Sequence, residues 1–300
     1  MKLSYYPGCT LKTKAKGLET SAIAVMAALG IELEELPRWN CCGTVYSFAE
    51  DDLMHHIASV RNLIRVREEG QSKVVTLCAF CYNTLKRVNL LMKSETDKLD
   101  AINSFMDEEP DYDGGVEVVH LLEVLRDDVG WEEISRRVKV PLRELKVAPY
   151  YGCTLHRPTE AAIESPNQPT ALPELLRALG AMAVDFPDTN TCCGSYQIVA
   201  NPDIVLNRAR DILTSARMRG AEMLAVSCPL CESNLGQKQR ELVGKENFEG
   251  MPIVYFTQLM ALALGLDPGV CQFDLNYADP RPLLQSKGLL PLVTAAGEAS

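Results

Sequence analysis

Ten of the eleven cysteines in this chain form two sets of five, in the same order and at similar intervals. Each set has a single cysteine, then an adjacent pair, then a pair separated by two residues. The first set is Cys9, Cys41, Cys42, Cys78 and Cys81, and the second is Cys153, Cys192, Cys193, Cys228 and Cys231. Because thiolates are ligands for soft metals, the pattern predicts two metal centres.

The composition fits a globular protein that needs no disulfides. With 300 residues, 47% of them hydrophobic, the chain can bury a large core and favours two domains. The N-terminus lacks an apolar signal region, and the apolar stretch 253–264 is too short to span a bilayer. We therefore expect a cytoplasmic protein with no membrane span, in which clustered cysteines bind metals or act as catalytic thiols. The net charge of −10 argues against a nucleic-acid partner.

Residues around the cysteines repeat as well, which indicates an internal duplication. Residues 8–11 read Gly-Cys-Thr-Leu, and residues 152–155 have the same sequence. A glycine follows the adjacent cysteine pair in both sets, as Gly43 and Gly194. The chain is therefore one structural unit encoded twice.

Each copy alternates short apolar runs with helical patterns, which predicts an α/β fold. We expect two similar domains related by a pseudo-twofold axis, each with a parallel sheet of about four strands flanked by helices. The expected strands cover 3–6, 31–36, 74–77, 116–119, 147–151, 181–186, 224–226 and 253–256. The expected helices cover 22–29, 53–69 with Asp51 or Asp52 as cap, 131–138, 172–179 and 204–218, and one more begins near Cys81.

The repeat also sets the expected domain limits. Residues 1–128 form the first domain and 146–270 the second, with 129–145 connecting them and 271–300 as a C-terminal tail. The acidic stretch 95–115 is an insertion of the first copy.

Three expected strands of each copy lead into a loop that carries cysteines. In an open α/β sheet, ligands lie beyond the carboxyl ends of the strands. Each set of five thiols should therefore converge at one edge of its sheet, and the pseudo-twofold axis should bring the two centres toward a shared cleft.

The donor set favours iron–sulfur clusters over other cysteine chemistry. A structural zinc takes four ligands, and adjacent cysteines rarely both bind one small ion, so zinc fits poorly but stays an alternative. Clusters offer several irons, to which adjacent thiolates can bind separately. A thioredoxin-like interpretation of the Cys-x-x-Cys pairs would leave the other six cysteines without a role. Cys271 has no counterpart and is expected to be a small buried residue.

The cysteine pattern, with glycine after each adjacent pair, resembles the cysteine-rich CCG domain. The tandem arrangement on a chain of this length resembles the B subunit of heterodisulfide reductases, and the likeness extends to the Asp-Pro-Arg-Pro-Leu-Leu sequence at 279–284. All ten motif cysteines are present.

The resemblance implies a specific chemistry. Each set would bind a noncubane [4Fe-4S] cluster, and the pair would cleave a disulfide, such as the mixed disulfide of coenzyme M and coenzyme B, to two thiols. It implies two partners: a ferredoxin-like [4Fe-4S] subunit of the C type in heterodisulfide reductases and, through it, a flavin-containing subunit of the A type. Two clusters suit the reaction because disulfide cleavage takes two electrons and a cluster ordinarily passes one.

Six further residues are candidates around the clusters. His156 lies three residues after Cys153, where the first copy has Lys12, and either side chain could bring protons or positive charge to nascent thiolates. A hydroxyl beside a cluster sulfur can donate a hydrogen bond that changes the reduction potential of the cluster, and a glycine lets the backbone approach the cluster. The candidates for these two roles are Thr10, Gly43, Thr154 and Gly194.

Two alternatives remain. Tandem CCG domains also occur in lactate-, glycolate- and fumarate-type oxidoreductases, where they pass electrons to a quinone or a thiol. A zinc-stabilised structural subunit of a redox complex is the other alternative.

Overall fold

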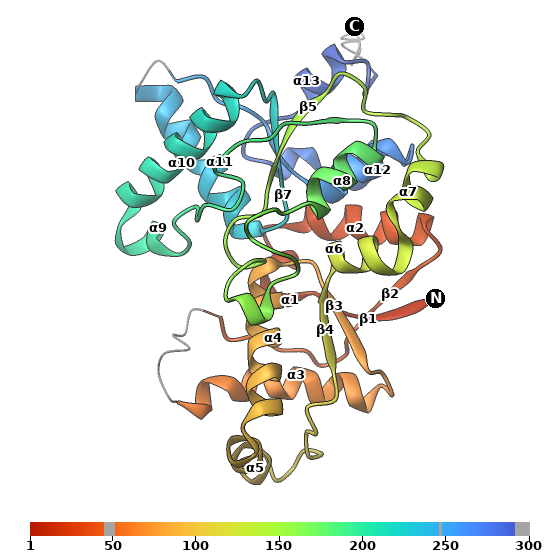
Figure 1. Ribbon diagram of the computed structural model, residues 1–300, viewed down its shortest axis with the longest axis vertical. Coiled ribbons are helices and arrows are strands. Elements are labelled where there is room, and N and C mark those ends of the chain that lie inside the picture. The colour runs from red at the N-terminus through yellow and green to blue at the C-terminus, as the bar shows by residue number, and fades with distance from the viewer. Residues whose placement is uncertain (45–51, 246–247, 292–300) are drawn as a thin grey trace, which may run out of the picture.

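The computed structural model describes residues 1–44, 52–245 and 248–291. It contains two four-stranded parallel sheets, with strand orders β2-β1-β3-β4 and β6-β5-β7-β8 (Figure 1). The matching orders confirm the α/β fold and the strand number expected for each copy. Strand bounds in the first sheet are β1 (Lys2–Tyr6), β2 (Glu32–Glu35), β3 (Lys73–Thr76) and β4 (Glu117–His120). Those in the second are β5 (Lys146–Tyr150), β6 (Met182–Ala183), β7 (Met223–Val226) and β8 (Ile253–Tyr255).

The register is also equivalent in the two sheets. Tyr5 of β1 pairs with Glu35 of β2 and Val75 of β3. Val147 of β5 pairs in the same way with Ala183 of β6 and Met223 of β7. Because every pair is parallel, the chain must cross over between strands, and helices fill these connections.

Strand β6 is shorter than the expected 181–186, and Pro149 explains the difference. The residue at the matching position of the first copy, Tyr5, accepts a hydrogen bond from the Leu36 backbone and keeps the chain beside β1. Pro149 has no N–H to continue the ladder, and its carbonyl accepts a hydrogen bond from Thr189 Oγ1 at 2.6 Å instead.

Helices cover both sheets and agree largely with the expected ranges. Asp52 caps the segment before α3 by accepting a hydrogen bond from the Met54 backbone, as predicted, whereas Asp51 lies outside the described residues. The insertion 95–115 contains a helix, α5, that the sequence patterns did not predict. The helices of the first copy and the connection are α1 (Gly8–Leu11), α2 (Lys16–Ala28), 3-10 helix η1 (Leu53–His56), α3 (Ile57–Glu68), α4 (Ala79–Ser94), α5 (Thr96–Phe105), α6 (Leu121–Glu123), π-helix η2 (Val124–Val129) and α7 (Trp131–Arg137).

The second copy has counterparts of α2, α3, α4 and α6, and further helices follow it toward the C-terminus. They are 3-10 helix η3 (Thr159–Ala161), α8 (Ala171–Ala178), α9 (Gln197–Ala200), α10 (Pro202–Met218), α11 (Pro229–Lys245), α12 (Phe256–Ala263), 3-10 helices η4 (Pro268–Cys271) and η5 (Phe273–Leu275), and α13 (Arg281–Ser286). In the part of the chain that the structure describes, every helix is too short or too polar to cross a bilayer.

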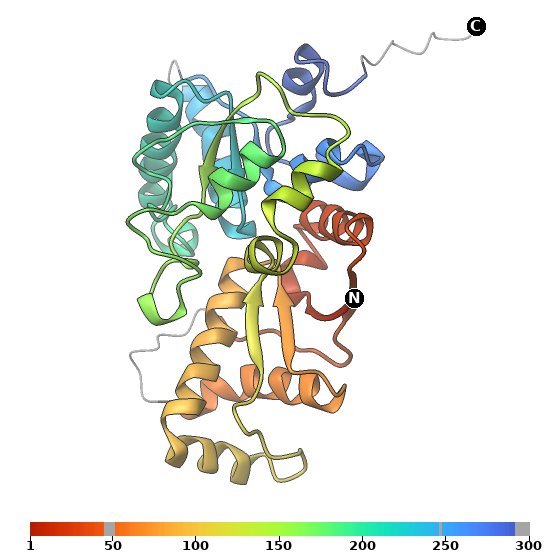
Figure 2. The ribbon, with the colours of Figure 1, turned by 45° about the vertical axis from the view of Figure 1, so that its right-hand side comes forward.

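The two copies pack through reciprocal helix contacts, as a pseudo-twofold axis requires. Helix α2 of the first copy packs on α12 of the second, and α8, the counterpart of α2, packs on α6, the counterpart of α12 (Figures 1 and 2). Between α2 and α12, the hydroxyls of Ser21 and Thr257 are 2.7 Å apart in a buried hydrogen bond. Gly17 on α2 lets the carbonyl of Cys271 approach closely.

Replacing Gly17 by valine is expected to destabilise this interface. A Cβ at Gly17 would lie 2.8 Å from the Cys271 carbonyl oxygen and 3.0 Å from Gln258 Nε2, so the helices must separate. Overpacking of this kind costs about 1–3 kcal/mol of unfolding free energy, measurable as a lower urea midpoint. The control Ala27→Val, on the exposed end of the same helix, should change the unfolding free energy by less than about 0.7 kcal/mol. Equal losses in both variants would contradict the close packing at Gly17.

Candidate functional site

The first set of cysteines gathers beyond the carboxyl edge of the first sheet. Cys9 follows β1, Cys78 follows β3, and the loop after β2 carries Cys41 and Cys42. The Sγ atoms of Cys41 and Cys9 are 3.9 Å apart, and those of Cys42 and Cys81 are 3.7 Å apart. Sequence positions as distant as 9 and 41 therefore meet because parallel strands end at one edge.

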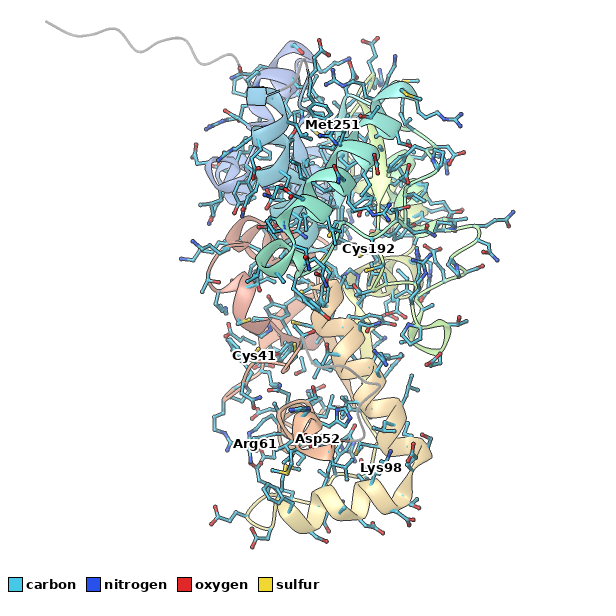
Figure 3. All side chains as sticks on the ribbon, turned by 90° about the vertical axis from the view of Figure 1, so that its left-hand side faces the viewer. Cys41, Asp52, Arg61, Lys98, Cys192 and Met251 are labelled. Carbon is cyan, nitrogen blue, oxygen red and sulfur yellow. The ribbon has the colours of Figure 1, made fainter. Side chains whose placement is uncertain are left out.

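The second set repeats this arrangement. The Sγ atoms of Cys153 and Cys192 are 3.7 Å apart, and Cys193 accepts a hydrogen bond from Asn234 Nδ2 at 3.4 Å. Figure 3 shows the labelled Cys41 in the lower half of the molecule and Cys192 in the upper half. The sets differ in exposure, because Cys9 and Cys41 are exposed whereas their counterparts are half-buried.

A buried tyrosine fixes the loop before each adjacent pair. Tyr6, at the end of β1, donates a hydrogen bond to the Asn40 carbonyl at 2.8 Å. Tyr150, at the end of β5, donates to the Thr191 carbonyl at 2.6 Å. The sequence analysis did not single out these tyrosines, although both copies have a tyrosine two residues before the glycine of Gly-Cys.

Close packing of the thiols shifts their proton affinities. Hydrogen bonds from Cys41 and Cys81 lower the pKa of Cys42 below that of a free thiol. In the second set a hydrogen bond from Cys153 lowers the pKa of Cys192. Each set thus contains a thiol that ionises readily, and the thiolate is the form that binds metals.

Two glycines provide space for the thiols. Gly8 and Gly152 both have φ of +70°, and a Cβ at either would lie 2.8 Å from the Sγ of Cys81 or Cys231. Gly43 and Gly194 also have positive φ, at +78° and +97°. Only at Gly8 and Gly152 does the missing Cβ leave room for a sulfur, because a Cβ at Gly43 would meet Ala58 and one at Gly194 would meet Val205.

Five soft donors against a glycine cradle fit an iron–sulfur centre in each set. The chemistry of the donors, thiols without nearby hard ligands in the set, is the one that such clusters use. Within residues 1–44, 52–245 and 248–291, no three histidine, cysteine or acidic side chains are arranged to hold a single metal ion.

The predicted residues near the sulfurs have different surroundings. Thr10 Oγ1 lies 3.8 Å from Cys9 Sγ, whereas Thr154 contributes its backbone carbonyl to a hydrogen bond from Asn83. Lys12 forms ion pairs with Glu19 at 2.7 Å and Glu35 at 2.6 Å.

His156 is buried, with 1% of its surface exposed. Its ring packs 4.5 Å from the Tyr151 ring, and Nε2 lies 3.8 Å from Glu164 Oε1. Both ring nitrogens lack a hydrogen-bond partner in the described structure. Cys271 is fully buried, as expected, and its thiol donates to the Gln258 carbonyl.

A cavity of about 570 Å³ lies between the two copies, beside the first set. Its lining includes Cys9, Cys42, Cys78 and Cys81 from that set. On the opposite side the second copy contributes the residues between and after its Cys-x-x-Cys cysteines, not the cysteines themselves. These second-copy and tail residues are Tyr196, Pro229, Leu230, Glu232, Ser233, Arg240, Tyr255, Asp274, Leu275, Asn276 and Tyr277.

The cleft expected from the sequence is therefore one-sided. Thiols of the first set line it directly, whereas the second Cys-x-x-Cys segment contributes Pro229 and Leu230, the two residues between its cysteines. Neither Lys12 nor His156 belongs to the described lining.

Sequence reasoning missed Glu232 and Tyr255, which meet at this cavity. Glu232 is buried and accepts hydrogen bonds from the Tyr277 backbone at 3.2 Å and the Tyr255 hydroxyl at 3.5 Å. Burial raises the pKa of Glu232 to about 7. One signal was present, since an acidic residue directly follows Cys231 where the first copy has Tyr82.

The comparison with protein families finds the family described as CCG, cysteine-rich domain, at residues 3–86 and 147–236. These two matches contain all ten cysteines of the two sets.

Two relatives match almost the whole chain. The 8-methylmenaquinol:fumarate reductase membrane anchor subunit of Wolinella succinogenes is 34% identical, over 94% of this chain and 99% of its own length. The B subunit of the ferredoxin/F(420)H(2)-dependent CoB-CoM heterodisulfide reductase of Methanosarcina acetivorans is 29% identical, over 92% of this chain and 93% of its own length.

Among solved structures, a hypothetical protein from Helicobacter pylori has the same fold, with a TM-score of 0.74 and 14% identity. The match covers 92% of this chain and 51% of that protein, so the chain spans about half its length.

Replacing Gly8 by alanine is expected to remove the metal of the first set alone. The new methyl group would occupy the position next to Cys81 Sγ, so bound iron should fall to about half, measured as iron and sulfide per chain. Gly152→Ala should do the same to the second set.

The matched control is Gly30→Ala, because Gly30 has φ of +84° and open space around its missing Cβ. It suffers the same backbone strain, about 1–3 kcal/mol, without touching a thiol. If Gly30→Ala lost as much iron as Gly8→Ala, the iron loss could not be assigned to the space that Gly8 leaves for Cys81 Sγ.

Proposed function

The chain belongs to the CCG family of cysteine-rich domain proteins, and we propose that it is the disulfide-cleaving subunit of a heterodisulfide-reductase-type complex. In this proposal each set of five cysteines binds one noncubane [4Fe-4S] cluster. The observation that carries it is the cavity between the two copies, with thiols of the first set in its wall and the second Cys-x-x-Cys segment opposite.

The duplication matches the electron count of the reaction. A disulfide accepts two electrons and two protons to give two thiols, and two clusters supply the electrons one at a time. The chain itself brings two loops of the same design to the two sides of one space. That arrangement supports a substrate with two equivalent reacting atoms.

The cavity walls suit a small organic disulfide. Phe80, Leu230 and Leu275 give apolar surface that excludes water from the reacting sulfurs. Lys14 and Arg240 line the same cavity and offer positive charge to an acidic group of the substrate. The shape of this lining would then select the disulfide.

The predicted roles of Lys12 and His156 in supplying charge or protons remain part of the proposal. Because both lie outside the described cavity lining, they would act through neighbouring groups, Glu19 and Glu35 for the lysine and Glu164 for the histidine. The roles of Thr10, Thr154, Gly43 and Gly194 near the clusters are proposed in the same way.

Electrons have to arrive from other proteins of the complex. The sequence has no nucleotide or flavin fingerprint and no ferredoxin-like cysteine motif. We propose a ferredoxin-like [4Fe-4S] partner, and through it a flavin-containing subunit, in the cytoplasm. The exposure of Cys9 and Cys41 gives the first set an accessible side for such a partner.

One observation favours a second candidate function. The fumarate reductase subunit from Wolinella succinogenes is 34% identical over almost the full length, against 29% for the heterodisulfide reductase subunit. The chain would then exchange electrons with a quinol or a thiol instead of cleaving a disulfide, using the same two centres.

Protein purified without oxygen is expected to contain about eight irons and eight sulfides per chain, the content of two [4Fe-4S] clusters. Cys42→Ser and Cys193→Ser should each lose one cluster, seen by electron paramagnetic resonance, and keep the other. Full zinc occupancy without iron would instead identify the structural alternative.

The two redox functions are separated by supplying the holoprotein with a reduced dye. The main proposal predicts release of two thiols per disulfide consumed, measured with a thiol reagent, and no reduction of a water-soluble naphthoquinone. Quinone reduction without thiol release would favour the second function.

A further inference from the structure

The space next to the cysteines is occupied differently in the two copies. In the first copy, α4 begins beside Cys78 and carries Tyr82 and Asn83, which bind the loop that follows Cys153. The Tyr82 hydroxyl donates to the Ala161 carbonyl at 2.9 Å, and Asn83 Nδ2 donates to the Thr154 carbonyl at 2.8 Å. The chain itself therefore fills the space between α4 and the second set.

In the second copy the equivalent positions face the cavity. Glu232 and Ser233 of α11 correspond to Tyr82 and Asn83, and both line the open space beside the first set. The C-terminal extension contacts α11 at the same cavity, where Arg240 Nε donates to the Tyr277 carbonyl at 2.7 Å. Among the described residues, the corresponding positions of the two copies thus differ: those of the first copy bind the other copy's loop, and those of the second line the cavity.

Tyr255 is a polar side chain of this cavity whose surroundings differ from those of its counterpart. Its equivalent at the end of β4, His120, is fully buried and satisfied, with Nε2 3.2 Å from the Leu77 carbonyl and Nδ1 accepting from the Leu122 backbone. Tyr255 is 4% exposed, lines the cavity, and makes one long contact of 3.5 Å with Glu232 Oε2.

Burial, followed by the charges of Glu232, Cys228 and Cys78, raises the pKa of the Tyr255 hydroxyl well above its usual value. The phenol is therefore a neutral hydrogen-bond donor with a single proton. Its 3.5 Å contact with Glu232 Oε2 is longer than an ordinary O–H···O hydrogen bond, so the proton can turn to another acceptor in the cavity.

We propose that Tyr255 donates a hydrogen bond to one sulfur of the disulfide in this cavity and stabilises the negative charge that develops there. This inference rests on the proposed function. One electron reaches each sulfur from the reduced partner subunits, the S–S bond breaks, and the two thiolates take protons from water. A donor aimed at the atom where charge appears acts mainly on the transition state. Glu232 accepts that proton at 3.5 Å when the cavity holds no disulfide, and it is a positioning residue.

The test compares Tyr255→Phe with Tyr112→Phe in the cluster-loaded complex, with bis(2-hydroxyethyl) disulfide as substrate. Tyr112 is a matched control because it is also buried, while its hydroxyl donates to Asn89 Oδ1 within the first copy and it lies outside the described cavity lining. Tyr255→Phe should lower kcat on the order of a hundredfold with little change in KM, as loss of one such donor does elsewhere. Tyr112→Phe should lower it less than about threefold.

A second readout does not depend on turnover. The product 2-mercaptoethanol, added to the oxidised holoprotein, should bind Tyr255→Phe about tenfold more weakly than wild type by calorimetry, because a hydrogen bond to a thiolate is lost. Iron content and resonance spectra should match wild type. If the wild type is active and Tyr255→Phe is equally active, or if the two bind the thiol equally well, the role of Tyr255 is refuted while the proposed function stands. A wild type that cleaves no disulfide overturns the proposed function and this inference together.

Discussion

The parallel order of the strands is the constraint on which the rest of this structure depends. Because all four strands of a sheet run in one direction, their carboxyl ends meet at one edge, and the loops that leave them carry the cysteines. Cys9 and Cys41 are far apart along the chain, yet their sulfurs are 3.9 Å apart. Hydrogen bonds from Tyr6 and Tyr150 then hold the loops, and Gly8 and Gly152 leave room for the sulfurs.

The duplication gives the protein two such sheet edges, and the packing of the two copies gives the cysteines at these edges different surroundings. The reciprocal contacts of α2 with α12 and of α8 with α6 set the copies about a pseudo-twofold axis. Single residues that differ between the two copies then determine which set of cysteines the cavity reaches. Asn83 fastens the loop after Cys153 over one side, whereas Ser233 at the matching position leaves the other side open. A symmetric fold thus holds an asymmetric cavity.

Local patterns predicted the fold well where the repeat reinforced them. The eight strands lie close to their expected places, apart from β6, which Pro149 shortens by breaking the ladder of its neighbour. Helix α5 escaped prediction because it lies in an insertion without a counterpart for comparison. At the site, the spacing of the cysteines in the sequence was enough to predict the two sets. The place of Tyr255 was not predictable in this way, because it lines the cavity together with thiols that lie in the other copy, far away in the sequence.

The sequence by itself determined the chemistry of the donors, the duplication and the alternation of strands and helices along the chain, since each depends on residue type and on local periodicity. Tertiary structure alone decided which thiols face the cavity, and it placed Glu232 and Tyr255 there in preference to Lys12 and His156. The physical reason is that ion pairs and burial act between segments far apart in the chain. Glu19 and Glu35 hold Lys12, and Tyr151 covers His156, while the two copies close around one shared space.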